Sequence, residues 1–123
     1  MATQGNQIRE SMVAGADLSA KQFTFVKMNT TDRTVVNAGN GEAAMGVLIN
    51  DPTSGQAATV VTHGRVMVEV GTGGLTAGDL VGVDASGEAV TAASPDIVVG
   101  QCVDGGAAGT RATIDFFRGG NAA

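Results

Sequence analysis

One histidine and one cysteine are present in the sequence, so a Ser–His–Asp triad or a Cys–His pair would have to use His63 or Cys102. His63 and Gly64 separate two alternating apolar runs, which predicts a two-residue hairpin turn with His63 as a turn residue. Cys102 lies in the apolar stretch DIVVGQCV, where cysteine packs as a small hydrophobe without a basic neighbour to activate it. We interpret both residues as structural.

Acidic and glycine-rich segments also fail to form a recognisable site. The twelve carboxylates are scattered, and several border a turn or a strand end: Asp51, Asp79, Asp84, Asp96 and Asp104. The spacing from Asp84 to Glu88 provides too few ligands for a calcium loop, and GNGEAAMG does not match a dinucleotide fingerprint. We therefore expect no metal, no cofactor and no enzymatic activity.

A lysine suggests an alternative function. Lipoyl and biotinyl carrier domains consist of two similar β halves and modify a lysine at an exposed hairpin tip, and VKM at residues 26–28 resembles their short motif. Lys27 instead continues the predicted strand FTFVKM, and the segment GTGG between the two halves contains no lysine. A non-enzymatic carrier or ligand-binding β module is therefore an alternative hypothesis, and an enzyme accessory domain is another.

Composition and charge argue against nucleic-acid binding and membrane contact. The chain has 123 residues, 19 of them glycine, and seven basic against twelve acidic residues give a net charge of −5. Because no basic cluster occurs, nucleic-acid binding through a basic face is not expected. The N-terminal stretch MATQGNQIRESMVAG lacks a signal-peptide pattern, and no apolar run reaches membrane-spanning length. We expect a protein made in the cytoplasm that does not contact membranes.

Short runs rich in valine, isoleucine, phenylalanine and threonine recur between glycine, asparagine or aspartate residues. This spacing predicts an all-β fold with little helix: a small barrel or sandwich, with the β-clip as one candidate architecture. A second hairpin is predicted at Asp84–Gly87, where aspartate and serine can bond the turn backbone and glycine permits positive φ.

An internal repeat organises these strands. Leu18 to Val26 matches Leu75 to Val83 at an offset of 57, and AAMGVLI matches IVVGQCV at an offset of 54, as does GQAATV with GTRATI. The predicted division is an N-terminal arm at 1–14, one β domain at 15–118 with pseudo-repeats 18–60 and 75–114, and a flexible tail at 119–123.

Several segments in order resemble the small head-decoration, or capsid cement, proteins of tailed bacteriophages: DLSAKQFTFVKMN, GEAAMGVLIND, PTSGQAATVVTHGRVMVEV, GLTAGDLVGVDASGEAV and DIVVGQCVD. The resemblance implies a structural virion protein on the outer capsid surface. Such a protein binds the major capsid protein, associates as a homotrimer and stabilises the expanded head. The resemblance does not assign a function to any individual residue.

Two segments are the expected contacts with the capsid or with other subunits. FTFVKM has apolar residues on both faces, so one face could pack in the core and the other against a subunit. Residues 2–12 could be disordered in solution and add a strand to a capsid edge, or could be a frayed tail without a role. The predicted interface residues are Gln7, Ile8, Arg9, Met12, Phe23 and Phe25.

Overall fold

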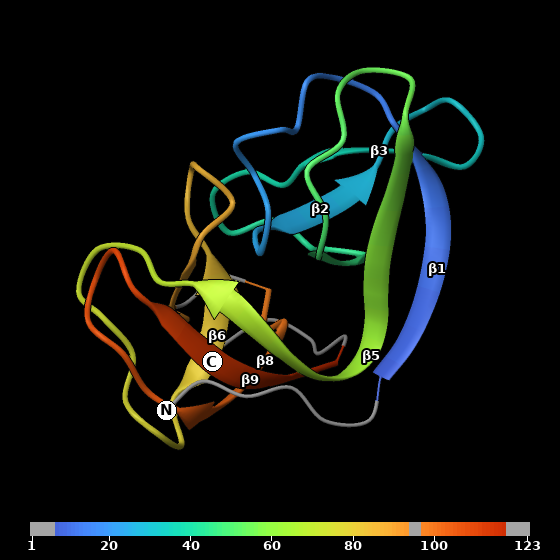
Figure 1. Ribbon diagram of the computed structural model, residues 1–123. Coiled ribbons are helices and arrows are strands. Elements are labelled where there is room, and N and C mark those ends of the chain that lie inside the picture. The colour runs from blue at the N-terminus through green and yellow to red at the C-terminus, as the bar shows by residue number, and fades with distance from the viewer. Residues whose placement is uncertain (1–6, 94–96, 118–123) are drawn as a thin grey trace.

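The computed structural model describes residues 7–93 and 97–117, which form nine β-strands and no helix. This confirms the predicted all-β class, and Figure 1 shows strands gathered in two groups joined by one long strand. The strands are β1 (Gln7–Ala14), β2 (Phe25–Met28), β3 (Thr34–Asn37), β4 (Gly46–Leu48), β5 (Ala57–Glu69), β6 (Leu80–Val83), β7 (Ala89–Thr91), β8 (Gly100–Asp104) and β9 (Arg111–Phe116).

The first group is a closed barrel, which we call the N-terminal barrel. Its strands follow the order β1, β3, β2, β4 and the first half of β5, and β1 closes the ring by pairing antiparallel with β5. The β1–β3 pair is parallel, whereas the other neighbours are antiparallel. Closure leaves these strands without a free edge, so their backbone groups are used within the barrel.

The second group repeats this arrangement and is called the C-terminal barrel. The second half of β5 pairs with β9, followed by β8, β6 and β7. A single parallel bridge from Val70 to Ala89 closes this barrel, at the position that the parallel β1–β3 pair occupies in the first barrel. The long strand β5 therefore belongs to both barrels (Figure 1).

Strand register shows how far the repeat extends. Val47 pairs with Val61, and the residues 54 positions later, Gln101 and Asp115, also pair with each other. Gly46 and Gly100 share a further constraint, because a Cβ on either would overlap a carbonyl oxygen of the neighbouring strand, that of Val61 or Asp115. The repeated glycine in AAMGVLI and IVVGQCV is thus explained by close strand packing.

The alignment of β2 with β6 differs from the predicted one. Val26 pairs with Gly46 and Val81 with Gly100, so the offset here is 55, and Phe25 corresponds to Leu80. The predicted match of Phe23 with Leu80 and of Val26 with Val83 was therefore wrong by two residues. Leu18 and Leu75 occupy equivalent positions, but Leu75 precedes β6 by five positions whereas Leu18 precedes β2 by seven. Similarity of apolar residues alone could not locate this two-residue deletion.

Residues 7–14 are not a free arm, so this part of the predicted arm at 1–14 was wrong. Met12 pairs with Ala58 of β5, and 56 positions later Val68 pairs with Ala112 of β9. Strand β1 is therefore the counterpart of the second half of β5 and the first strand of its barrel. Residues 1–6 and the predicted tail at 119–123 lie outside the described residues.

No hairpin turn forms at His63 and Gly64, which lie inside the continuous strand β5. Gly64 has φ of 109°, and the register slips where Ile8 pairs with His63 but Arg9 pairs with Val61. The positive φ and the unmatched residue bend the strand from one barrel into the next. The predicted turn at His63 was therefore wrong: a glycine that bends a strand gives the same local pattern as a hairpin.

The hairpin at Asp84–Gly87 is confirmed between β6 and β7. The Asp84 N–H donates to the Glu88 carbonyl at 2.9 Å, and Asp84 Oδ1 accepts the N–H groups of Ser86 and Glu88 at 2.8 and 2.9 Å. Gly87 has φ of 81°. The predicted roles of aspartate and glycine in this turn are both observed.

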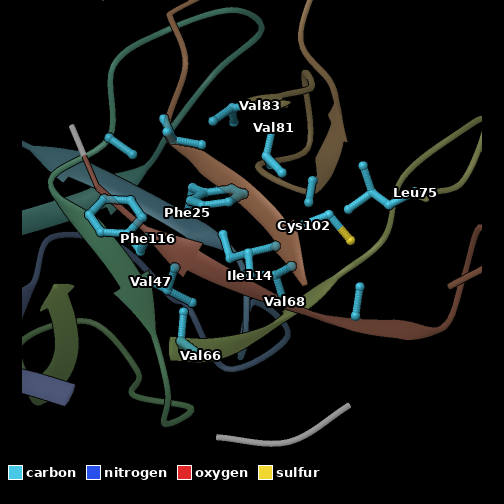
Figure 2. Packing of buried hydrophobic residues seen from close by; sticks show 14 of the residues in the cluster. Phe25, Val47, Val66, Val68, Leu75, Val81, Val83, Cys102, Ile114 and Phe116 are labelled. Atoms are coloured by element: carbon cyan, nitrogen blue, oxygen red, sulfur yellow. The ribbon is translucent and has the colours of Figure 1, made fainter. Parts of the chain in front are cut away.

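The apolar core follows the same repeat. Eight buried residues fill the N-terminal barrel: Met12, Ala14, Leu18, Val26, Val35, Leu48, Ala58 and Val60. Their counterparts are all buried in the C-terminal barrel: Val68, Val70, Leu75, Val81, Ala89, Cys102, Ala112 and Ile114. The second cluster also includes Phe25, Val47 and Val61 of the first barrel, so it continues across the contact between the barrels (Figure 2).

Candidate functional site

The two barrels meet through a tightly packed apolar contact. Phe25 of β2 is fully buried, and its ring centroid lies 6.2 Å from that of Phe116 on β9 (Figure 2). The Phe25 N–H donates to the Gly87 carbonyl at 2.8 Å. Aromatic packing and a backbone hydrogen bond thus fix β2 of one barrel against the hairpin of the other.

Phe23 forms a second connection in an unusual backbone conformation. Its φ is 66°, a region costly for a bulky residue, and its counterpart is Gly78 with φ of 93°. The Phe23 carbonyl accepts the Glu69 N–H at 2.8 Å, and the Arg111 guanidinium lies 4.4 Å from the ring centroid. Arg111 Nε also donates to Glu69 Oε1 at 3.3 Å. These contacts across the two barrels offset the backbone strain.

Polar contacts complete the junction. Asn37 Nδ2 and Lys21 Nζ both donate to the Ser86 carbonyl, at 2.8 and 3.4 Å. The Gly41 N–H donates to the Val83 carbonyl at 2.8 Å. With the apolar contact, these bonds hold the loops of the N-terminal barrel on the β6–β7 hairpin, so the two barrels form one continuous unit.

Three of the six predicted interface residues lie in the interior. Met12, Phe23 and Phe25 are 8%, 7% and 0% exposed, so their side chains are not available to a partner. Of the apolar residues in FTFVKM, Phe23, Phe25 and Val26 are buried within the chain and Met28 is 44% exposed, so only Met28 remains available to a subunit. The sequence pattern was ambiguous because a strand between two packed barrels is apolar on both sides.

The other three predicted interface residues cluster at the start of β1. Ile8 is 59% exposed and Arg9 is exposed, whereas Gln7 is partly buried. Arg9 Nε donates to Gln7 Oε1 at 2.8 Å, and Gln7 Nε2 donates to the Arg65 carbonyl at 2.9 Å. The structure thus places the Arg9 and Gln7 side chains on one side of a fixed strand, and the exposed Ile8 side chain, one residue away, on the other.

The residues considered for chemistry do not converge. Cys102 is 2% exposed in the core, and burial, followed by Asp79 and Asp104, raises the pKa of its thiol. This confirms the interpretation of Cys102 as a packed hydrophobe. His63 is exposed on β5. Within residues 7–93 and 97–117, no group of three His, Cys, Asp or Glu side chains could hold a metal ion.

Lys27 lies within β2, as the sequence predicted, and not at a hairpin tip. Its Nζ forms an ion pair with Glu42 Oε1 at 2.9 Å. The Lys27 hydrogen bond, followed by one from the Gly39 N–H, lowers the pKa of Glu42. Lys27 therefore links β2 to the following loop, and its amine is engaged in an ion pair.

The exposed surface carries large apolar side chains, of which only Ile8 was among the predicted interface residues. Within the described residues they are Ile8, Val13, Met28, Leu80 and Phe117. Alternation along β1 gives a sequence signal for Val13, because Met12 and Ala14 face the core and Val13 between them must face outward. The exposure of Met28, Leu80 and Phe117 became identifiable only when the neighbouring strands were in place.

Comparison of the sequence with known proteins and a search of the structure for membrane spans both gave negative results. No family model and no curated protein matches the sequence. Among the described residues, no helix is long and apolar enough to cross a membrane.

A solved structure does match the fold. The crystal structure of the head fiber gp8.5 N base in bacteriophage phi29 aligns with a TM-score of 0.74 and 17% sequence identity. The alignment covers 96% of this chain and 100% of the phage chain, so both barrels are included. This chain therefore shares the fold of a bacteriophage head-fiber base.

Proposed function

We propose that this protein is a structural, non-enzymatic component of a tailed-bacteriophage virion. It binds the outer surface of the shell of major capsid protein, associates there as a homotrimer and stabilises the expanded head. The observation that carries the proposal is the fold shared with a phage head-fiber base over 96% of the chain. The order of turn and strand motifs supports it independently, because it resembles that of the small capsid cement proteins.

The mode of binding follows from barrel closure. Backbone groups of residues 7–14 already pair with β5, so this segment cannot add a strand to a capsid edge without opening its barrel. Contact of this segment with the shell then uses side chains on a preformed surface. Many modest contacts of this kind become strong when copies occupy a symmetric lattice together.

The proposed contact with the shell is the start of β1. Ile8 is the most exposed of the large apolar side chains, at 59%, and the exposed Arg9 follows it on the opposite side of the strand. An exposed apolar group on one side of a strand and a cation on the other suit a partner that contacts both sides, through an apolar pocket and an acidic group. This surface retains Gln7, Ile8 and Arg9 from the predicted interface.

Co-sedimentation with expanded, undecorated heads tests the function. The purified protein should bind in saturable, stoichiometric amounts, and the heads should withstand heating better when decorated. Heads that bind none of the protein at saturating concentration would refute the proposal.

A double variant tests the proposed contact. Ile8→Asp with Arg9→Glu should reduce affinity for heads about tenfold or more, since central interface residues typically contribute at least that much. Ala108→Asp, on an exposed loop of the other barrel, is the matched control. If the double variant binds heads as tightly as the native chain and the Ala108→Asp control do, the start of β1 is not the contact.

The carrier hypothesis gains no support. A modified lysine must project from a tip, whereas Lys27 is partly buried in β2 and paired with Glu42.

A further inference from the structure

The contact between the two barrels joins unlike faces. We call face A the side of the N-terminal barrel that carries Phe25 and Asn37, which bond Gly87 and Ser86 of the other barrel. We call face B the side of the C-terminal barrel that receives it. Face B is defined by Glu69, Val83 and Gly87, whose backbone groups bond Phe23, Gly41 and Phe25 respectively.

Because the barrels are repeats, each also carries the face that its neighbour uses. The positions of face A recur on the C-terminal barrel at Leu80 and Thr91, the counterparts of Phe25 and Asn37 by strand register. The positions of face B recur on the N-terminal barrel at Val13, Met28 and Arg33. Within residues 7–93 and 97–117, a contact between unlike faces therefore leaves one face of each kind, here called free, without a barrel docked on it.

The exposed apolar side chains coincide with these free faces. Leu80 is 46% exposed where its counterpart Phe25 is fully buried, and Met28 is 44% exposed where its counterpart Val83 is fully buried. Val13, the counterpart of Glu69, is 41% exposed. Three of the five exposed large hydrophobics within the described residues thus occupy positions that are contact positions in the other barrel.

Backbone conformation strengthens the correspondence on face B. Arg33 has φ of 56°, and Gly87, its counterpart 54 positions later, has φ of 81°. The N-terminal barrel therefore has a positive φ at the position that accepts Phe25 within the chain, but its Arg33 carbonyl already accepts the Val13 N–H at 2.8 Å. Here the turn also carries a cation, and Arg33 Nη2 donates to the Ser11 carbonyl at 3.1 Å.

Charge distinguishes the two free faces. Free face A lies beside Asp79 and Asp115, whose counterparts Thr24 and Val61 are uncharged and buried. Residues 7–63 contain four basic and five acidic residues, against two and seven for residues 64–117. Asp115 forms an ion pair with Arg65 at 3.0 Å, which offsets part of this charge, and Asp79 accepts hydrogen bonds from Thr76 and Thr91. Leu80 thus lies beside one carboxylate that has no ion pair in the described residues, whereas the free face of the N-terminal barrel carries Arg33. Opposite charges would favour this pairing over contact between two like faces.

We infer that copies of this protein associate head to tail, with free face A of one copy on free face B of the next. The second copy repeats the apolar part of the docking that exists within the chain: Leu80 packs against Val13 and Met28, and Arg33 meets the carboxylates beside Leu80. The Val13 N–H already donates to the Arg33 carbonyl, so the contact uses side chains and not the backbone bonds of the internal junction. This inference deepens the proposed self-association and rests on that part of the proposed function. Closure of the chain of copies into a ring would limit its size.

Paired variants test the direction of the contact. Leu80→Asp blocks free face A and Met28→Asp blocks free face B, and both sites are exposed enough for the fold to tolerate the change. By light scattering at about 100 µM, the native protein should exceed the monomer mass and each variant alone should be monomeric. An equimolar mixture of the two variants should form a 1:1 dimer, because each retains the face that the other lacks.

The controls separate folding and function from association. Thr72→Asp, exposed in the loop after β5, should leave the native mass unchanged, and circular dichroism should show that all variants keep their strand content. The gentler variants Leu80→Ser and Met28→Ser repeat the test if an aspartate variant fails to fold. A monomeric native protein, or a mixture of variants that stays monomeric, would overturn the inference. Binding of heads is measured separately, so either proposal can fail while the other stands.

Discussion

Replacing Met12 by alanine tests whether β1 belongs to the fold. Met12 is 8% exposed and packs in the core of the N-terminal barrel, so the substitution removes three buried heavy atoms. At about 0.8 kcal/mol for each buried methylene-sized group, the loss is about 2.4 kcal/mol, and an unfilled cavity would add to it. We expect the free energy of unfolding to fall by about 2 to 3 kcal/mol and Tm to fall by about 10 °C.

Urea unfolding followed by circular dichroism measures this change. Ser11→Ala is the matched control, because Ser11 is exposed on the same strand and its replacement should change stability by less than about 0.5 kcal/mol. Val68→Ala removes the counterpart of Met12 and should be destabilising by a similar mechanism. If Met12→Ala changes stability no more than Ser11→Ala, residues 7–14 do not contribute to the core, and the assignment of β1 to the barrel is wrong.

Three further outcomes are expected. Gly100→Ala should destabilise the protein by about 2 kcal/mol or more in urea, because the added Cβ meets the Asp115 carbonyl; a neutral effect would contradict the close strand approach. The pKa of Glu42 is lowered in the folded state, so its stabilising contribution exists above its unfolded pKa and is lost as pH falls through the folded one. The difference in free energy of unfolding between the native chain and Glu42→Gln should therefore shrink on acidification. A difference that grows as the pH falls would contradict a lowered pKa of Glu42. Cys102 should react with a thiol reagent at neutral pH only in denaturant, whereas rapid labelling of the folded protein would show that it is accessible.

Local patterns predicted local structure well. The β6–β7 hairpin follows from Asp84 and Gly87, whose interactions span four residues, and the buried strand containing Cys102 follows from its apolar run. The repeat was visible because Gly46 and Gly100 meet the same steric requirement in both halves. Each of these features depends on residues that are close in sequence or on a constraint that is repeated.

Pairing between strands far apart in sequence decided the features that local patterns did not predict, namely strand β1 and the bend at Gly64. Residues 7–11, polar except for Ile8, gave no sign of a strand. Strand β1 is defined by its pairing with β5, about fifty residues away, and only its last residues face the core. Gly64 looked like a turn because a strand that passes from one barrel to the next needs the same backbone freedom as a hairpin. The sequence by itself thus determined the β class, the repeat and one hairpin. The tertiary structure alone decided that the halves are closed barrels stacked on unlike faces, because burial of Phe25 and exposure of Leu80 depend on which neighbour each barrel has.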